Sequence, residues 1–316
     1  MILVTGAAGF IGSHLVRELA ANGQKVRAVD CLLTDSYSSE LKLKNWKELQ
    51  SLGNVDCQIV DLRLPLNGNL LSDIKIIINE AAMPGLVKSW KNFDLYSSCN
   101  ILSVNNLLEA AIEKDISHFV QISTSSVYGN VNSGDESLPL NPISPYGVTK
   151  LAAEEIVKMY SRTRGMQYTI LRYFSVFGPK QRPDMAYHKF IQSIMNGRTI
   201  NVYGDGKQIR TNTYVDDCVS ATISAALANP SNSEFNISGG EPVELMNAIS
   251  EIEAQLGMKA KIDFHASHPG DQRTTISVSG KAKESFGFEP KFSFKEGISR
   301  QIDWQRGLTQ DYVMDV

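Results

Sequence analysis

The sequence predicts an α/β fold with a doubly wound parallel sheet, a Rossmann sheet, and a smaller, partly interleaved α/β domain. Short β-branched runs alternate with helix-like stretches through the first half of the chain, the pattern of a parallel sheet covered by helices. The run at residues 76–78 is apolar throughout, as expected for a strand buried on both faces. A glycine-rich turn joins the first run to the first helix.

The predicted strands and helices follow one another in regular order until the pattern weakens. We expect strands at residues 2–5, 25–30, 56–60, 74–79, 118–123 and 168–174. Helices are expected at residues 13–21, about 94–113 and about 146–161. After about residue 175, turn clusters at residues 178–179, 204–206 and 239–240 interrupt the alternation. We therefore predict a first domain of residues 1–174, rejoined by about residues 209–237, and a second domain of residues 175–316.

Composition and charge narrow the functional class. The 316 residues include 31 lysines and arginines against 34 acidic residues, a net charge of −3, which argues against nucleic-acid binding through overall charge. The four cysteines form no CxxC pair, so neither a disulfide framework nor a metal site is expected. No uncharged apolar run approaches membrane-spanning length. We expect a cytoplasmic protein without metal, nucleic acid or membrane as a partner.

The glycine-rich turn after the first predicted strand is the first sign of a cofactor. Glycines at this spacing let the backbone turn tightly and approach a pyrophosphate placed on the helix N-terminus. The turn opens the chain, follows a strand and precedes an amphipathic helix, which makes a dinucleotide site the preferred interpretation. Its residues expected to contact the cofactor are Gly6, Gly9, Phe10, Ile11 and Gly12.

Asp30 indicates which dinucleotide binds. It ends the second predicted strand, 18 residues after Gly12, where a carboxylate can accept hydrogen bonds from the adenosine ribose hydroxyls. The same carboxylate would repel a 2′-phosphate, and residues 31–33 offer no cation to bind one. NAD is therefore preferred over NADP, and residues 1–174 become the predicted NAD-binding domain.

A tyrosine and a lysine four residues apart form the predicted catalytic pair. Ser144 and Pro145 mark a helix start, so Tyr146 and Lys150 share one helical face. A base working at neutral pH needs a tyrosine pKa about three units below its ordinary value near 10, or about 4 kcal/mol. A lysine ammonium about 4 Å away supplies on the order of 4 kcal/mol. Thr124, at the end of a predicted strand, would bring a hydroxyl group to the same place.

With these motifs together, the chain resembles the extended short-chain dehydrogenase/reductases, and among them the NAD-dependent epimerase/dehydratase family. The resemblance covers nearly the whole length. Beyond the glycine turn and the tyrosine–lysine pair it includes residues 61–62, 81–82, 100, 124–129, 172–179, 181–184, 203–210, 214–217 and 269–271. It implies an enzyme that binds NAD and a nucleotide sugar.

The resemblance also implies contacts for individual residues. Further cofactor contacts would be Asp61, Leu62, Ala81, Ala82, Asn100, Tyr146, Lys150 and Tyr173. Substrate contacts would be Thr124, Ser125, Ser126, Ser175, Arg182, Arg210 and Asp271. Tyr146 would be the base, Lys150 its activator and Thr124 the partner of the sugar hydroxyl. The guanidinium groups of the two arginines would clamp the substrate diphosphate.

The residues after Thr124 indicate the reaction. Dehydratases of the family resemble one another in an Asp-Glu pair at this place, and its decarboxylases carry Glu where Ser126 stands. Ser125 and Ser126 cannot do carboxylate acid–base work at neutral pH. One base and one hydride carrier fit 4-epimerisation through a 4-keto sugar. The local sequence around Ser175 and Arg182 looks most like UDP-glucuronate 4-epimerases, which would interconvert UDP-glucuronate and UDP-galacturonate. The close alternative is a 4-epimerase of UDP-glucose and UDP-galactose, or of UDP-linked N-acetylhexosamines.

Other interpretations stay open. A dehydratase or reductase could take carboxylates from elsewhere in the cleft, and a non-catalytic NAD-sensing protein could keep the fold. Glu80 puts a charge near the cofactor at a position where relatives often have Leu, and Lys88 or Arg273 could contact the substrate. The family resemblance implies a homodimer formed through the helices at about residues 94–113 and 146–161.

Overall fold

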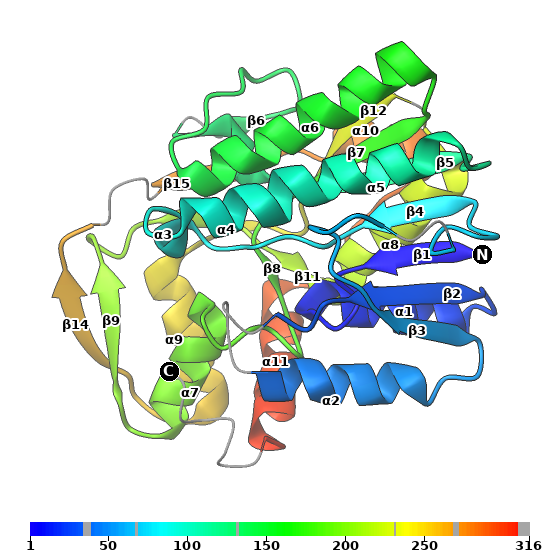
Figure 1. Cartoon of the computed structure of the whole chain (residues 1–316). Coiled ribbons are helices and arrows are strands. Elements are labelled where there is room, and N and C mark those ends of the chain that lie inside the picture. Colours follow the sequence, from blue (N-terminus) through cyan, green and yellow to red (C-terminus); the bar gives the residue numbers. More distant parts are fainter. Residues whose placement is uncertain (34–38, 67–68, 131–132, 231, 268–271, 309–316) are drawn as a thin grey trace.

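A parallel sheet forms the centre of the molecule in a computed structural model that describes residues 1–33, 39–66, 69–130, 133–230, 232–267 and 272–308. Seven strands pair in the order β12-β7-β5-β4-β1-β2-β3 (Figure 1), and all neighbours are parallel. They are β1 (Ile2–Thr5), β2 (Val26–Asp30), β3 (Val55–Ile59), β4 (Ile76–Asn79), β5 (His118–Thr124), β7 (Tyr168–Tyr173) and β12 (Ser233–Ile237). The predicted doubly wound sheet is confirmed, and the six predicted strands have ends shifted by two residues or fewer.

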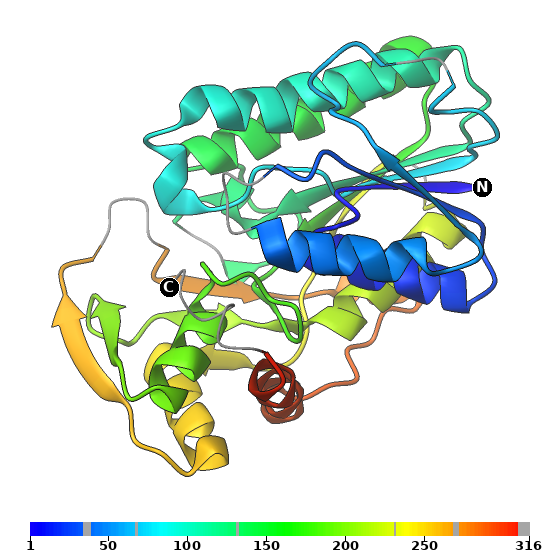
Figure 2. The same ribbon diagram turned by 60° about the horizontal axis from the view of Figure 1, so that its bottom comes forward.

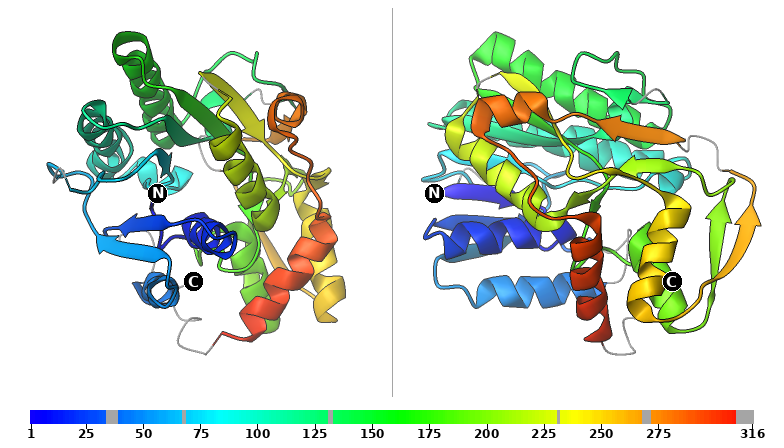
Figure 3. Two further views of the ribbon diagram at one scale, coloured as in Figure 1. Left: turned by 90° about the vertical axis from the view of Figure 1, so that its right-hand side faces the viewer. Right: turned by 180° about the vertical axis from the view of Figure 1, so that it is seen from behind.

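Helices cover both faces of this sheet. One layer contains α1 (Phe10–Ala21), α2 (Ser39–Gln50) and α8 (Val215–Ala228). The other contains α5 (Ser103–Ile112) and α6 (Pro145–Arg164), and the left panel of Figure 3 shows the two layers end on. The predicted helix at about 94–113 is divided into α4 (Phe93–Ser97), a π-helical turn η1 (Ser98–Leu102) and α5, while the short α3 (Leu86–Ser89) precedes it.

Smaller sheets lie beside the seven-stranded one (Figure 2). Two are strand pairs: β8 (Val176–Phe177) with β11 (Thr213–Tyr214), and β9 (Thr199–Tyr203) with β14 (Lys261–His265). The third has the order β13 (Pro242–Glu244), β10 (Ile209–Thr211), β15 (Thr274–Ser277) and β6 (Ser133–Gly134). The accompanying helices are α7 (Ala186–Met195), α9 (Leu245–Leu256), α10 (Gly280–Phe286) and α11 (Phe294–Arg306). Because β6 comes from the first half and β12 from the second, the chain passes between the two parts more than once.

Alternate side chains of the central strands supply two cores, one on each face of the sheet. Val4 of β1 packs with Leu15 and Val219, whereas its neighbour Leu3 packs with Ile77 and Leu108. All six are fully or almost fully buried. No helix in the described ranges is long and apolar enough to cross a membrane.

The topology determines where a site can form. The carboxyl ends of the parallel strands meet at one edge of the sheet, and in open α/β sheets ligands bind outside that edge. β1 ends there in the glycine turn, β2 in Asp30, and β5 in Thr124. Residues distant in sequence are therefore brought to a single place.

Candidate active site

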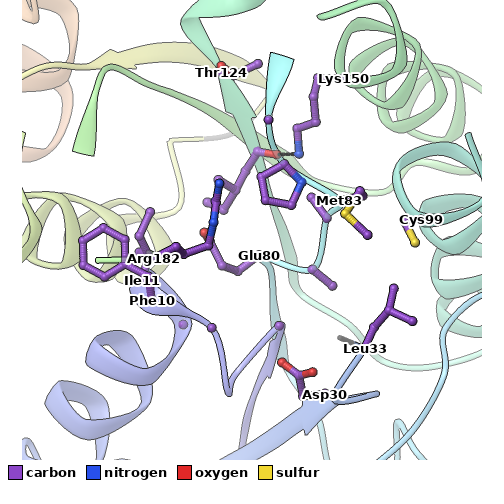
Figure 4. Close-up of a pocket in the computed structure, with 18 of the residues that line it drawn as sticks. Phe10, Ile11, Asp30, Leu33, Glu80, Met83, Cys99, Thr124, Lys150 and Arg182 are labelled. Atoms are coloured by element: carbon purple, nitrogen blue, oxygen red, sulfur yellow. Dashed lines mark hydrogen bonds between the residues drawn. The ribbon is translucent and has the colours of Figure 1, made fainter. Parts of the chain in front are cut away.

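A cavity of about 520 Å³ lies at the carboxyl edge of the central sheet, a volume within the usual range for a small-molecule or cofactor site. Predicted site residues that line it are Gly6, Gly9, Phe10, Ile11, Gly12, Asp30, Asp61, Leu62, Ala81, Ala82, Thr124, Tyr146, Lys150, Tyr173, Ser175 and Arg182. We call the region of Asp30 and Asp61 the aspartate end, and the region of Thr124, Tyr146 and Lys150 the tyrosine end. Figure 4 shows Asp30 and Lys150 on opposite sides of the opening.

The glycine turn is shaped by close backbone approach. Gly6 has a φ of +65°, which favours glycine, and a Cβ there would lie 2.9 Å from the backbone nitrogen of Ala81. A Cβ on Gly12 would collide with the Gly6 carbonyl oxygen. Gly9 precedes α1, and no side chain caps this helix. The N–H groups of its first turn are therefore available to the oxygens of a pyrophosphate.

Asp30 ties this turn to the end of β2. Its Oδ2 accepts a hydrogen bond from the Ala8 N–H at 3.0 Å, and its Oδ1 accepts one from the Leu32 N–H at 2.7 Å. Each carboxylate oxygen can accept a further hydrogen bond. Asp30 can therefore hold the turn and still receive ribose hydroxyls.

Two cations at the aspartate end were not anticipated from the sequence. The Arg63 Nη2 donates to Asp61 Oδ2 at 2.6 Å, and this hydrogen bond lowers the pKa of Asp61. Lys42 of α2 also lines the cavity, and its Nζ donates to the Leu33 carbonyl at 2.7 Å. Both cations are engaged by protein oxygens, so the argument for NAD continues to depend on Asp30. Arg63, two residues after Asp61, was visible in the sequence, whereas Lys42 is brought in by the packing of α2.

The predicted start of the catalytic helix is confirmed. Pro145 opens α6, and the Ser144 hydroxyl accepts a hydrogen bond from the Gly147 N–H at 3.1 Å. This cap places Tyr146 in the first turn, where it reaches the cavity. Lys150 lies one turn further along on the same face.

Tyr146 has two side-chain neighbours at the tyrosine end. The Thr124 side chain lies near its hydroxyl and acts to lower its pKa. Its ring meets the ring of Tyr96 edge-on, with the centroids 6.3 Å apart. The Tyr96 hydroxyl donates to the Pro84 carbonyl at 2.8 Å, which fixes that ring. Tyr96 was not predicted as a site residue, because it belongs to a different helix and carries no motif of its own.

In the protein without its cofactor, the Lys150 charge does not lower the pKa of Tyr146. Burial raises the pKa of Tyr146, although the Thr124 hydrogen bond and the Arg182 charge act to lower it. The Lys150 Nζ instead donates to the Ile122 carbonyl at 2.7 Å, and burial lowers the pKa of Lys150. Desolvation disfavours both charged forms at once. A positive ligand group beside the phenol is needed to bring its pKa toward neutrality.

A buried ion pair anchors the catalytic helix to the sheet. Glu154 of α6 and Arg172 of β7 are joined by two hydrogen bonds, of 2.7 Å and 3.0 Å, and both side chains are almost completely buried. The Ser123 hydroxyl donates to Glu154 at 2.5 Å, and Arg172 also donates to the Tyr128 hydroxyl at 2.9 Å. Glu154 follows Lys150 by one helical turn, so this network supports the position of the lysine. It was not predicted, because its members come from separate elements.

Several predicted contacts do not line the cavity. Asn100 lies behind its wall, where its amide bonds to the Met83 backbone at 2.7 Å and 3.1 Å and to the Thr149 hydroxyl at 3.0 Å. Ser125 and Ser126 begin the short 3₁₀ helix η2 (Ser125–Tyr128) and are buried beside the wall.

The predicted arginine clamp is not assembled as expected. Arg182 lines the cavity and makes two hydrogen bonds of 2.9 Å to Asp184. Arg210 instead donates to the backbone carbonyls of Ile209 and Arg273 and is absent from the cavity lining. The Arg273 side chain pairs with Asp205 near the surface. Among the other candidates, Lys88 does not line the cavity, and Asp271 lies outside the described residues.

The site fits a dinucleotide that joins its two ends. The glycine turn accepts close approach of a pyrophosphate, and Asp30 offers acceptors for an adenosine ribose. The opposite end then receives the second nucleotide half beside Tyr146 and Lys150. The described residues hold no cluster of three or more His, Cys, Asp or Glu side chains arranged for a metal ion.

Comparison with known proteins identifies the family. Residues 2–238 match the NAD dependent epimerase/dehydratase family. The chain belongs to this family. NAD is accordingly its cofactor, as the sequence predicts.

Relatives of this family member match over almost the full length. It is 39% identical over 314 residues to YtcB of Bacillus subtilis, named an uncharacterized UDP-glucose epimerase, with 98% of this chain and 99% of the relative covered. It is 34% identical over 313 residues to the UDP-glucuronate 4-epimerase of Thermodesulfobacterium geofontis, covering 96% and 95%.

Solved structures agree with the fold. The UDP-glucuronic acid 4-epimerase of Bacillus cereus, in complex with UDP-glucuronic acid and NAD, is similar with a TM-score of 0.94 and 37% identity over 98% of this chain and 99% of that one. The dTDP-glucose 4,6-dehydratase DesIV of Streptomyces venezuelae has a TM-score of 0.90 at 26% identity, covering 98% of each chain. Since epimerase and dehydratase share the fold, the reaction must be argued from the site residues.

Proposed function

We propose that this family member is an NAD-dependent nucleotide-sugar 4-epimerase acting on UDP-glucuronate and UDP-galacturonate. The observation that carries the proposal is the composition of the tyrosine end, where Tyr146 and Thr124 line the cavity and the chain continues with serines at 125 and 126 instead of carboxylates. The B. cereus and T. geofontis relatives, both UDP-glucuronate 4-epimerases by name, support the choice of sugar.

The protein residues then have distinct tasks. NAD, when bound, would supply the acceptor and the donor for the C4 hydride. Tyr146, as phenolate, takes the proton of the 4-hydroxyl group, and Thr124 holds that hydroxyl group within reach. Lys150, oriented by the Ile122 carbonyl, would add a positive charge to the tyrosine end once the phenolate forms.

Arg182 is the proposed cation for the anionic part of the substrate. It lines the cavity and is held by Asp184 in a two-bond arrangement. Although burial acts to raise the pKa of Asp184, the hydrogen bond and charge of Arg182 hold it below its ordinary value. Asp184 therefore stays ionised and keeps the guanidinium oriented toward the cavity. Ser175, with a φ of +29°, lines the cavity together with Thr124, and these neutral hydroxyl groups would hold a uronate carboxylate without protonating it.

A dehydratase is the rival with a specific observation in its favour. Glu80 is a carboxyl group of the cavity wall that is absent from the proposed epimerase chemistry. Dehydration needs an acid and a base at the sugar carbons beyond C4. The charge of Glu80 instead acts on the buried Tyr173 and Cys218 and is itself influenced by Lys150, and serines occupy the place after Thr124.

A product assay tests the proposal. Purified protein is incubated with NAD and, separately, with UDP-glucuronate, UDP-glucose and UDP-N-acetylglucosamine, and the products are identified by mass spectrometry and NMR. We expect UDP-galacturonate, of unchanged mass, to form fastest. Loss of water would favour the dehydratase, and faster turnover of UDP-glucose would transfer the assignment to the neutral sugar named for YtcB.

We also propose a cytoplasmic homodimer whose NAD-binding part comprises residues 1–174 and about 209–237 and whose substrate-binding part comprises the rest of 175–316. Exposed apolar side chains on the outer layer support the dimer: Leu102, Ile112, Val148 and Met159 are each between 37% and 47% exposed. Sedimentation at micromolar concentration tests it, and a monomeric mass would contradict it.

A further inference from the structure

Glu80 is part of the cavity wall, but neither the proposed reaction nor the aspartate end uses it. The residue is partly exposed where it borders the cavity, whereas its Oε2 atom is buried and has no hydrogen-bond partner in the described part of the chain. A buried carboxyl oxygen without a partner costs free energy. Figure 4 shows Glu80 between Asp30 and Lys150, where a bound ligand would complete its surroundings.

Hydrogen bonds hold the residues on both sides of Glu80. Asn79 accepts from the Thr5 hydroxyl at 2.6 Å and donates to the Gln121 side chain at 2.9 Å. The Ala81 N–H donates to the same Thr5 hydroxyl at 3.0 Å. The backbone at Glu80 is therefore fixed, and its carboxyl group is held on the cavity side of the strand end.

Titratable and charged groups from three elements surround the Glu80 carboxyl group. They are Tyr146, Lys150 and, behind it, Glu154 of α6, Tyr173 of β7 and Cys218 of α8. Burial raises the pKa of Glu80 to about 8, although the Lys150 charge acts to lower it, so a further positive charge decides whether the carboxyl group is ionised near neutral pH. Burial also raises the pKa of Tyr173 and of Cys218, so both stay neutral. The Lys150 charge favours the ionised form of Glu80, and a second positive charge would favour the carboxylate further.

This neighbourhood belongs to the nicotinamide end of the cofactor. Tyr146 must lie beside the sugar carbon that is oxidised, because the proton and the hydride leave the same C–OH group. The redox-active ring must therefore bind at the tyrosine end, next to Lys150 and Glu80. An oxidised nicotinamide ring carries a positive charge that the reduced ring lacks, while the two forms share the same adenosine half.

We propose that Glu80 is a specificity-determining residue of the cofactor site, whose carboxylate makes the protein bind oxidised NAD in preference to NADH. The inference rests on the proposed function, because it requires the nicotinamide to lie at the tyrosine end. A carboxylate in a buried site attracts the oxidised ring and gains nothing from the neutral reduced ring. The protein would thereby rest in the oxidised form that begins each catalytic cycle.

The test compares the affinities for the two cofactor forms without any sugar. Kd values for NAD and for NADH are measured by calorimetric titration on the unaltered protein, on Glu80→Gln, which keeps the shape and removes the charge, and on Glu80→Leu. The matched control is Asp61→Asn, which removes a carboxylate from the aspartate end of the same cavity.

We expect both Glu80 variants to shift the ratio of the two Kd values toward NADH by about tenfold. Asp61→Asn should change both Kd values by the same factor, because the adenosine half is identical in NAD and NADH. A ratio unchanged in the Glu80 variants would overturn this inference and leave the proposed function intact. A protein that binds neither form would overturn both.

Discussion

The aspartate end and the tyrosine end of the cavity differ in how their polar groups are paired. Asp30 accepts two backbone hydrogen bonds, and Asp61 is paired with Arg63. At the tyrosine end, the Glu80 Oε2 has no partner among the described residues, and burial raises the pKa of Tyr146. At the aspartate end, the polar groups are paired with other protein groups. At the tyrosine end, the charge of the polar groups depends on the ligand that binds there.

This difference indicates that the aspartate end serves cofactor binding and the tyrosine end serves the chemical step. Paired groups in a folded chain are held in one geometry and contribute affinity, because little reorganisation accompanies binding. Buried groups with shifted pKa values respond strongly to a nearby charge, which is what a base must do. Substitutions at the aspartate end should therefore change affinity, whereas those at the tyrosine end should change turnover and its pH dependence.

The largest expected effect follows from Tyr146→Phe. Turnover should fall by about 10³-fold or more, because a general base contributes about 10²–10⁴-fold. NAD affinity should stay within about twofold, measured by titration beside the rate assay, since the ring still packs against Tyr96.

Tyr96→Phe is the matched control for that substitution. It removes a hydroxyl group bonded to the Pro84 carbonyl and leaves both rings in place. Turnover should fall by less than about tenfold, because the substitution affects the orientation of the Tyr146 ring and leaves the proton-transferring hydroxyl group in place. If the Tyr146→Phe protein turned over about as fast as the Tyr96→Phe protein, Tyr146 would not be the base.

The next largest effect is expected at the glycine turn. In Gly12→Ala the new Cβ would collide with the Gly6 carbonyl oxygen. The backbone must shift, which should cost about 1–3 kcal/mol of unfolding free energy and displace the N–H groups that receive the pyrophosphate. Chemical denaturation and NAD titration measure the two effects.

Gly53→Ala is the control, because no atom lies within 4 Å of a Cβ at that position. It should leave both quantities unchanged within error. If Gly12→Ala bound NAD as tightly as the unaltered protein, the pyrophosphate would have to bind elsewhere.

A smaller effect concerns the pH profile at saturating NAD. Turnover should rise with pH as Tyr146 loses its proton, because the phenolate is the active form of the base. The Glu80 charge acts to raise the pKa of Tyr146. Glu80→Gln should therefore move the midpoint of the rise to lower pH, by about one unit or less. A midpoint moved to higher pH would show that Glu80 acts on the base in some other way.

The fold was largely predictable, because its signals are local. Alternation of β-branched and helical stretches placed the six strands, and the Ser144-Pro145 pair placed the start of α6. The glycine turn was predictable for the same reason, since one strand, one turn and one helix are adjacent in sequence. Strand β12 was implied only by the expected return of about residues 209–237.

The site was predictable only in part, because side-chain partners are not local. Nothing in the sequence pairs Glu154 with Arg172, yet this ion pair holds the catalytic helix on the sheet. Arg210 matched a family motif but is engaged by backbone carbonyls. The direction of the Tyr146 pKa depended on burial, a tertiary property that a four-residue spacing does not carry.

The smallest expected effect lies at the aspartate end, in Asp61→Asn. The Asp61–Arg63 pair is partly exposed, with side-chain exposures of 25% and 27%. Its loss should therefore weaken NAD binding by about threefold and leave kcat unchanged. The substitution also releases the Arg63 guanidinium from its carboxylate, and a guanidinium is well suited to a phosphate. NADP should therefore bind relatively better, measured as the ratio of the NADP and NAD dissociation constants. Adding Arg63→Met to Asp61→Asn should return that ratio toward its original value, and a ratio unaffected by Arg63 would place the ribose away from this pair.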